Sequence, residues 1–225
     1  MVEALIFDVD GTLAETEEVH RRAFNDAFAA LGLPWHWTQR DYHRLLKVTG
    51  GKERIAAHME AIGTDPGRVD IPALHAAKTA RYTAMIAQGK IALRPGVQAL
   101  MDAAQSQGVR LAIATTTSRP NVDALAQAIW GCAAVDIFGV IACGDEVAAK
   151  KPAPDVYHLA LMRLGVTADR AVALEDSRNG LLSARAAGIA VVVTPSAYTG
   201  DEDFSGALLV LPDLGLMKGS CIWRL

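Results

Sequence analysis

Short apolar runs recur along the chain and alternate with segments of helical periodicity. Six runs are short and apolar throughout, as expected for strands that are buried on both faces of a sheet: residues 4–8, 110–116, 139–143, 171–176, 190–194 and 207–211. Helical segments lie between most of them, and three carry capping signals: residues 96–108, 154–165 and 177–188. This alternation predicts an α/β fold, a Rossmann-like parallel sheet core with helices on both faces.

One long stretch interrupts the alternation and contains no run typical of a strand. Its polar, helix-like pieces lie within three segments, residues 38–48, 51–63 and 71–89. We expect them to form an inserted α-helical cap domain that determines substrate specificity. The chain then divides into a catalytic core and this cap, residues 1–15 with 95–225 and residues 16–94 respectively. The two connections, near residues 14–18 and 93–96, would let the cap open and close as a lid.

The first strand ends in two aspartates, Asp8 and Asp10, one residue apart and followed by Gly-Thr. Carboxylates this close repel each other and are costly to bury, which indicates a cation between or above them. Asp-Gly is also a strong hairpin signal. The hairpin alternative is disfavoured because the segment after Thr12 carries a helical apolar stripe, with Val19, Phe24 and Phe28 among its members, and no partner strand.

Polar residues also follow two later strands. In open parallel sheets, ligands bind beyond the carboxyl ends of the strands, where the strand order reverses. If the strand order brings these ends together, four carboxylates converge on one pocket: Asp8, Asp10, Glu175 and Asp176. We expect them to bind Mg²⁺, which suits a site made of oxygen ligands. The sequence offers no rival His or Cys cluster for a softer metal.

Four stretches in this order resemble the motifs of the haloacid dehalogenase superfamily of phosphotransfer enzymes: DVDGT at 8–12, AIATTTS at 112–118, KKPAPDVY at 150–157 and ALEDS at 173–177. The resemblance covers nearly the whole chain. The residues of these motifs are most similar to those of the branch that contains the β-phosphoglucomutases and the CbbY proteins. It implies the fold of that superfamily, a requirement for Mg²⁺ and an aspartyl-phosphate intermediate.

The resemblance also implies roles for the motif residues. Asp8 would be the nucleophile, and Asp10 would bind the metal through its backbone carbonyl while its side chain serves as general acid and base. Lys151 would offset the charge of Asp8 and the phosphate, although a Lys before Pro is usually a surface residue. Thr115 and the amide of Thr116 would bind phosphoryl oxygens at a helix start, although a Thr that ends a strand often reflects β-propensity alone. We assign the neighbouring Lys150 to the surface.

The segment 44–55, RLLKVTGGKERI, places cations around a Gly-Gly turn and a helix start. Lys47, Lys52 and Arg54 would seat a second phosphate there, with backbone N–H groups of the helix end. The alternative is an exposed helix start with solvated charges.

Further residues of the cap are candidates for binding the rest of the substrate. Glu17 would accept hydrogen bonds from sugar hydroxyls, or it would pair with Arg21 four residues later. A lone helical His such as His20 is often structural, but the family places a functional His there. The resemblance also places Tyr42 and Lys78 at the cleft.

Composition excludes several classes of partner. With 22 basic and 25 acidic residues the net charge is −3 and no basic tract is present, so we expect no nucleic-acid partner. The odd set Cys132, Cys143 and Cys221 lacks a Cys-x-x-Cys spacing, which favours free, buried thiols in a reducing compartment. No stretch has the length of a membrane span, and no leader segment is evident. We therefore expect a cytoplasmic monomer without membrane contact whose partner is a small-molecule sugar phosphate.

The cap loop narrows the hypotheses about the reaction. β-Phosphoglucomutases carry Gly-Val-Ser-Arg directly after the Lys of this loop, whereas Lys47 is followed by Val-Thr-Gly-Gly-Lys-Glu-Arg. The resemblance is therefore greatest to CbbY proteins, which accompany carbon-fixation genes and hydrolyse the Rubisco inhibitor xylulose-1,5-bisphosphate to xylulose 5-phosphate and phosphate. The alternatives are a sugar phosphomutase, a phosphatase for another small phosphate ester and a regulator without turnover. The sequence assigns no role to residues 216–225.

Overall fold

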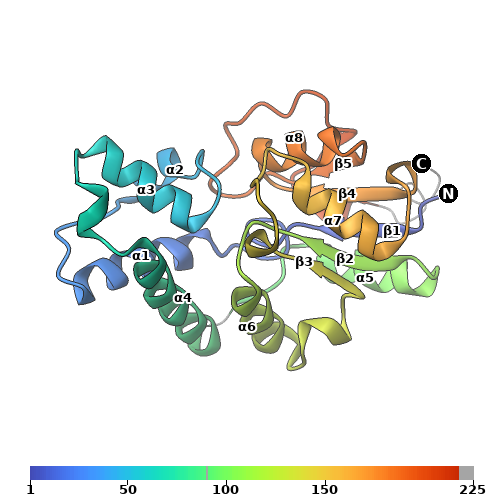
Figure 1. Cartoon of the computed structure of the whole chain (residues 1–225). Helices are drawn as coiled ribbons and strands as arrows, with labels where there is room; N and C mark the ends of the chain where they lie inside the picture. Colours follow the sequence, from blue (N-terminus) through green and yellow to red (C-terminus); the bar gives the residue numbers. More distant parts are fainter. Residues whose placement is uncertain (90, 218–225) are drawn as a thin grey trace.

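The computed structural model describes residues 1–89 and 91–217. A parallel six-stranded sheet in the order β3-β2-β1-β4-β5-β6 forms its centre (Figure 1). The strands are β1 (Ala4–Phe7), β2 (Arg110–Ala114), β3 (Val140–Ala142), β4 (Ala171–Glu175), β5 (Ala190–Val193) and β6 (Leu209–Val210). All neighbouring strands run parallel, which confirms the expected α/β sheet.

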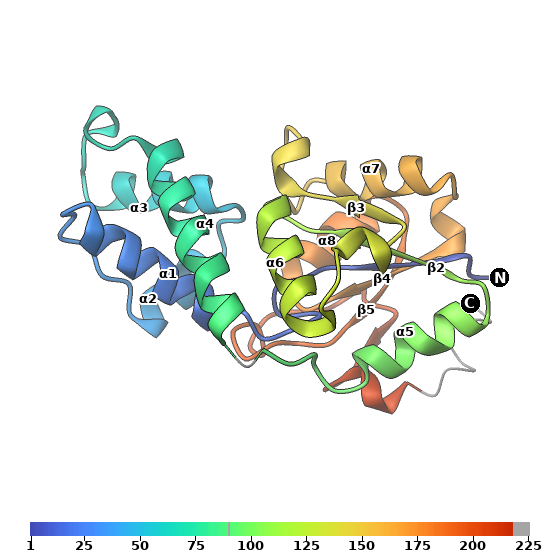
Figure 2. The ribbon, with the colours of Figure 1, turned by 90° about the horizontal axis from the view of Figure 1, so that it is seen from below.

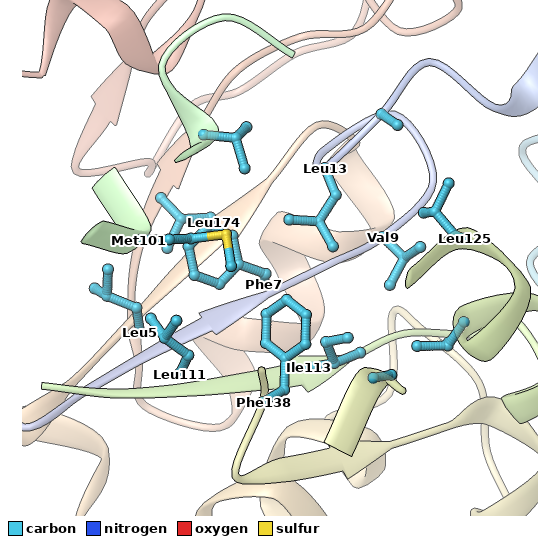
Figure 3. Close-up of a cluster of buried hydrophobic side chains, with 14 of the residues drawn as sticks. Leu5, Phe7, Val9, Leu13, Met101, Leu111, Ile113, Leu125, Phe138 and Leu174 are labelled. Carbon is cyan, nitrogen blue, oxygen red and sulfur yellow. The ribbon is translucent and has the colours of Figure 1, made fainter. Parts of the chain in front are cut away.

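Helices cover both faces of the sheet because successive strand residues point to opposite sides. On one face, Leu5 and Phe7 of β1 pack with the apolar sides of α5 (Val97–Ser106) and α6 (Arg119–Trp130), as Figure 3 shows. On the other, Ala4 and Ile6 pack with α7 (Asp155–Leu164) and α8 (Arg178–Ala186). The strands are therefore apolar throughout rather than alternating, as the sequence indicated.

Four helices lie apart from the sheet, beyond the end toward which β1 runs (Figures 1 and 2). They are α1 (Glu17–Ala30), α2 (Gln39–Leu45), α3 (Gly51–Ala61) and α4 (Ile71–Gln88), and we call them the cap. The cap has an aromatic core of its own, the cap cluster: Phe24, Ala27, Phe28, Trp37, Tyr42, Ile55, Met59 and Leu74. Thr38 and Asp41 form a capping box at the start of α2, and Asp70 caps α4 through the Ala73 N–H.

The last strand differs from the expectation. Residues 207–211 were expected to be buried on both faces, but β6 contains only Leu209 and Val210, which are 42% and 50% exposed. The prediction of two-sided burial is wrong here because β6 lies at the sheet edge and neither of its residues packs into the two core clusters, whereas Ile141 and Ala142 of β3, at the other edge, do.

Several remaining expectations concern the cysteines and the chain end. Cys132 and Cys143 are free thiols, and Cys143 is buried, whereas Cys132 is half-buried. Cys221 and most of the unassigned segment 216–225 lie outside the described residues. Within the part of the chain that the structure describes, no helix has the length and apolar character needed to cross a membrane.

Candidate active site

The order of the strands brings the motif residues together. β1 lies between β2 and β4, and the three strands run parallel, so their carboxyl ends meet at one edge of the sheet. This edge faces the cap and borders a cavity. Of the expected catalytic and metal-ligating residues, the cavity is lined by Asp8, Asp10, Thr115, Lys151 and Asp176.

Lys151 links the first strand to the fourth. Its Nζ donates to Asp8 Oδ1 at 2.7 Å, to Glu175 Oε1 at 2.6 Å and to the Ala114 carbonyl oxygen at 2.9 Å. These three bonds use every proton of the ammonium group. Burial alone would lower the pKa of Lys151, but Asp8 and Glu175 outweigh it and raise that pKa above its ordinary value. Lys151 is 3% exposed and is therefore a fixed buried cation, not a surface lysine.

Three carboxylates form an acidic cluster, which we define as Asp8, Glu175 and Asp176. One oxygen of each lies within 4.8 Å of the others. Burial raises the pKa of Asp8 to about 8, with Lys151 opposing and Glu175 adding to the shift, and burial likewise raises the pKa of Asp176 well above its ordinary value. Glu175 Oε1 also accepts from Tyr157, but Oε2 has no partner among the described residues. One ammonium for three buried carboxylates leaves negative charge that a divalent cation would balance.

The carboxylate of Asp10 lies apart from this cluster, although it lines the same cavity as Asp8 and Asp176, so three of the four expected carboxylates form one close group. Asp10 Oδ1 accepts from Thr16 Oγ1 at 2.6 Å and lies 2.9 Å from His20 Nε2. Burial would raise its pKa, but His20 and Thr16 outweigh burial and hold the pKa of Asp10 well below its ordinary value. The side chain therefore faces the cap, where a departing or attacking oxygen would be protonated or deprotonated.

His20 continues this chain of contacts into the cap. Its Nδ1 lies 2.6 Å from Lys78 Nζ, and its ring stacks on Tyr82 with 3.9 Å between centroids. Burial lowers the pKa of Lys78 to about 7, although Asp10 opposes the shift. A His20 tautomer that donates from Nε2 to Asp10 accepts from Lys78 at Nδ1, so both contacts fix the same orientation.

Glu17, Tyr42 and Arg54 form a second group on the cap side. The Tyr42 hydroxyl donates to Glu17 Oε2 at 2.8 Å and accepts from Arg54 Nη1 at 2.9 Å. The alternative pairing of Glu17 with Arg21 is wrong, because Arg21 instead makes two bonds to Glu18, at 2.9 and 2.6 Å. Glu17 and Arg54 line the cavity, whereas Tyr42 is fully buried behind them and positions both.

The start of α3 faces the same cavity. Gly50 precedes the helix with φ of 91°, a conformation that side chains rarely adopt, and Gly50 through Arg54 all line the cavity. Lys52 Nζ lies 3.3 Å from Asp145 Oδ1, which belongs to the core. Lys47 is exposed, does not line the cavity and contributes only its backbone oxygen, which accepts from Asn179 Nδ2 at 3.1 Å.

Two further expectations are corrected. α6 begins at Arg119, so Thr116 precedes the helix rather than starting it, and Thr115 Oγ1 accepts from the Thr117 N–H at 3.2 Å. Lys150 is half-buried, donates to the carbonyl oxygens of Gly144 and Val147, and lines the cavity, so its assignment to the surface is wrong.

Sequence reasoning missed several residues that line the cavity: Thr49, His75, Ser118, Asn121, Asp145 and Asn179. Asn121 has a buried side-chain oxygen that is free to accept a hydrogen bond from a ligand. Its Nδ2 donates to Thr117 Oγ1 at 2.9 Å, whereas its Oδ1 has no partner among the described residues. Ser118 is the last residue of the motif at 112–118, and Asn179 lies two residues beyond the motif at 173–177, so the position of each in the sequence is a signal for the site. His75 and Asp145 carry no local signal, because only the packing of the cap on the core brings them to the cavity.

Comparison with known proteins agrees with this geometry. The family model described as haloacid dehalogenase-like hydrolase matches residues 2–188. Protein CbbY of Rhodobacter capsulatus is 60% identical over 213 residues, which cover 95% of this chain and 94% of that protein. Protein CbbY of Cereibacter sphaeroides is 54% identical over 219 residues, which cover 97% and 95%.

Solved structures show the same relationship. The crystal structure of CbbY from Rhodobacter sphaeroides in complex with phosphate has a TM-score of 0.97 at 53% identity and covers 100% of both chains. A mutant of CbbY from the same organism, in complex with xylulose-(1,5)bisphosphate, has a TM-score of 0.94 at 54% identity and covers 97% of each chain. The chain therefore belongs to the haloacid dehalogenase-like hydrolases and, within them, is CbbY-like.

Proposed function

We propose that this protein is a Mg²⁺-dependent phosphatase that hydrolyses xylulose-1,5-bisphosphate to xylulose 5-phosphate and phosphate. The observation that carries the proposal is the buried contact of Lys151 with Asp8, 2.7 Å long, beside the acidic cluster in a cavity shared with the cap. The solved CbbY structure with xylulose-(1,5)bisphosphate supports this choice of substrate, because that protein is 54% identical to this chain.

The acidic cluster fits a magnesium ion. Asp8, Asp176 and Glu175 supply the hard oxygen ligands that Mg²⁺ requires, with the backbone carbonyl of Asp10 as a further candidate ligand. Burial is the largest cause of the raised pKa values of Asp8 and Asp176, and the neighbouring Glu175 raises both further, so a bound cation would relieve the cost of ionising these carboxylates. When bound, the ion offsets the charge of the phosphate and of the carboxylates that surround it.

The chain's own groups then divide the work of hydrolysis. An oxygen of Asp8 attacks phosphorus, and the ester P–O bond breaks to leave an aspartyl phosphate and the sugar alcohol. Lys151 holds Asp8 in place, and Thr115 with the Thr116 amide binds the phosphoryl oxygens. Water then attacks the same phosphorus, and the bond between phosphorus and the Asp8 oxygen breaks, which releases phosphate and restores the Asp8 carboxylate.

Asp10 would move the proton in both steps. It gives a proton to the departing sugar oxygen and takes one from the attacking water. The contacts of Asp10 with Thr16 and His20 favour the carboxylate, so they suit the base step directly, and the acid step needs a proton taken up beforehand. Lys78, through His20, holds this group in its orientation.

We also propose that residues 16–94 form the cap domain and that it recognises the far end of the substrate. The start of α3 with Lys52 and Arg54 would bind the second phosphate, and Glu17 would bind sugar hydroxyls. Tyr42 acts by holding Glu17 and Arg54. The position of Lys47 outside the cavity gives it no part in this proposal.

Release of free phosphate over a panel of esters tests the function. The panel contains xylulose-1,5-bisphosphate, ribulose-1,5-bisphosphate, xylulose 5-phosphate, glucose 1-phosphate and an aryl phosphate, with Asp8→Asn as the inactive control. We expect the highest kcat/KM for xylulose-1,5-bisphosphate, with xylulose 5-phosphate as the product. An isomeric sugar phosphate formed without free phosphate would identify a mutase, and a preference for another ester would reject the substrate.

A further inference from the structure

One loop of the core contacts the cap and the acidic cluster through neighbouring residues. The loop follows β5 and covers residues 194–203, and we call it the β5 loop. Tyr198 packs against the cap cluster, whereas the next residue, Thr199, is buried against Asp176. The hydrolytic steps proposed above use neither side chain.

Thr199 makes one short hydrogen bond to the main chain of Asp176 and one longer contact with its carboxylate. Its Oγ1 donates to the Asp176 main-chain carbonyl oxygen at 2.7 Å and lies 3.4 Å from the carboxylate Oδ2. Gly11 closes the opposite side, because a Cβ atom there would lie only 2.2 Å from the same Oδ2. Thr199 is 5% exposed and lines the cavity. The carboxylate of Asp176 therefore lies between the loop after β1 and the β5 loop, where Thr199 holds the Asp176 main chain and contacts Oδ2.

Tyr198 reaches the part of the cap that frames the cavity. Its hydroxyl donates to Glu18 Oε2 at 2.7 Å, and its ring meets that of Tyr42 at 5.8 Å and 88°. Tyr42 in turn holds Glu17 and Arg54, which line the cavity. A shift of the cap against the core therefore moves or frees Tyr198.

The two contacts are joined by a tight turn. The Thr199 N–H donates to the Ser196 carbonyl oxygen at 3.2 Å, and the Ser196 N–H donates to Thr199 Oγ1 at 2.8 Å. Farther along the loop, Glu202 accepts from the Arg178 N–H at 2.6 Å and ties the loop to the start of α8. Because hydrogen bonds hold Ser196, Thr199 and Glu202, the chain around Tyr198 has little freedom to move by itself. A displacement of Tyr198 therefore also displaces Thr199.

We propose that Thr199 is a positioning residue for Asp176 and that Tyr198 couples docking of the cap to it. Asp176 is then best placed to hold Mg²⁺ when the cap is closed over a substrate. Because a coupling free energy between two events is reciprocal, Mg²⁺ in turn favours the docked cap. The inference rests on the proposed phosphatase function, in which Mg²⁺ bound by Asp176 is needed for hydrolysis.

Binding of Mg²⁺ alone, measured by titration calorimetry without substrate, tests the coupling. Thr199→Val removes the hydroxyl and should weaken Mg²⁺ binding about three- to tenfold, in the range of one buried hydrogen bond, whereas Thr199→Ser should bind nearly as the wild type does. Tyr198→Ala should weaken binding by a smaller factor. The double variant Tyr198→Ala/Thr199→Val should bind no more weakly than Thr199→Val, because both act through one contact.

The control is Asp201→Asn, which removes another contact between the β5 loop and the cap. Asp201 Oδ1 lies 3.0 Å from His43 Nε2, is 70% exposed and makes no contact with Asp176, so Mg²⁺ affinity should not change. Tyr198→Phe replaces Tyr198→Ala in the test if circular dichroism shows that Tyr198→Ala does not fold. Because Tyr198→Phe keeps the ring and loses only the hydroxyl, it should weaken Mg²⁺ binding less than Tyr198→Ala.

Several outcomes would overturn the inference. Wild-type Mg²⁺ affinity in Thr199→Val excludes the positioning role, and wild-type affinity in both Tyr198 variants, or additive effects in the double variant, excludes the coupling. A wild-type protein that binds no Mg²⁺ also overturns it. Failure of the proposed function is a separate result, since it shows as absent phosphate release from a protein whose Mg²⁺ titrations still behave as expected.

Discussion

The metal-free protein should lose stability as the pH rises, and Asp8 should be a main cause. Burial raises the pKa of Asp8 from an ordinary 3.8 to about 8. The folded state therefore keeps a proton on this carboxyl up to about pH 8, whereas the unfolded chain releases it near its ordinary pKa. Stability linked to Asp8 is full below the lower value and is lost as the pH approaches the higher one. Asp8→Asn removes the ionisation, so the variant should be more stable than the wild type at pH 8 in chelator.

The size of the effect follows from the proton balance. One bound proton changes the free energy of unfolding by about 1.4 kcal/mol per pH unit, so the interval from pH 5 to pH 8 sets a ceiling of about 4 kcal/mol. Asp8→Asn also removes the effect of Asp8 on Asp176, whose raised pKa owes part of its shift to Asp8. The pKa of Asp176 is therefore lower in the variant, where Asp176 takes over part of the ionisation that Asp8 undergoes in the wild type. We therefore expect the advantage of Asp8→Asn to grow by about 2 kcal/mol between pH 5 and pH 8.

Urea unfolding followed by circular dichroism at several pH values between 5 and 8, in chelator, measures the difference. Asp145→Asn is the matched control, because it makes the same change at a carboxylate that lines the cavity but is 50% exposed. Saturating Mg²⁺ should stabilise the wild type more than Asp8→Asn, because it binds the intact cluster better. An Asp8→Asn protein that is less stable than the wild type at pH 8 without metal, or a difference independent of pH, would refute the reasoning.

Three further measurements test the rest of the site. Asp10→Ala should slow phosphate release roughly 10²–10⁴-fold while substrate still binds in equilibrium titrations, because only proton transfer is lost; an unchanged rate would exclude that role. Arg54→Ala should lose about 2–3 kcal/mol in kcat/KM for a ketopentose bisphosphate but little for an aryl phosphate, which also reports on folding, and equal losses would exclude the distal-phosphate seat. Chelator should abolish activity, added Mg²⁺ should restore it and excess Ca²⁺ should suppress it, so full activity in chelator would contradict the metal site.

Much of the fold could be predicted because burial leaves a direct mark on the sequence. Four of the expected strands lie in the sheet interior, and β3, at one edge, is still buried at Ile141 and Ala142; their residues are apolar at successive positions because helices cover both faces. The sixth expected strand, residues 207–211, had the same apolar appearance but lies at the edge. An apolar run shows that a segment can be buried, and only the neighbours that pack on it decide whether it is.

The candidate site was predictable as a set of residue types, but few of its contacts were. Asp8 and Asp10 were recognisable because two carboxylates at a strand end need a cation, and the later motifs carried a family resemblance. The pairing of Lys151 with Asp8 was implied by that resemblance, whereas the contact of Asp10 with His20 depends on side-chain direction. The side chains of Asp8 and Asp10, which follow the same strand, point to different partners. The sequence alone does not indicate which partner each one contacts.

The sequence by itself determined the class of the fold, the inserted helical cap and the chemical types gathered at the strand ends, since each depends on local patterns of apolar, capping and charged residues. Tertiary structure alone decided the strand order, which places β1 between β2 and β4 and closes the acidic cluster. It also placed the half-buried Lys150 at the cavity, left Lys47 exposed and turned Glu17 to Tyr42 instead of Arg21. These outcomes depend on contacts between segments far apart in the chain, whose energies are set by packing geometry rather than by any pattern within one segment.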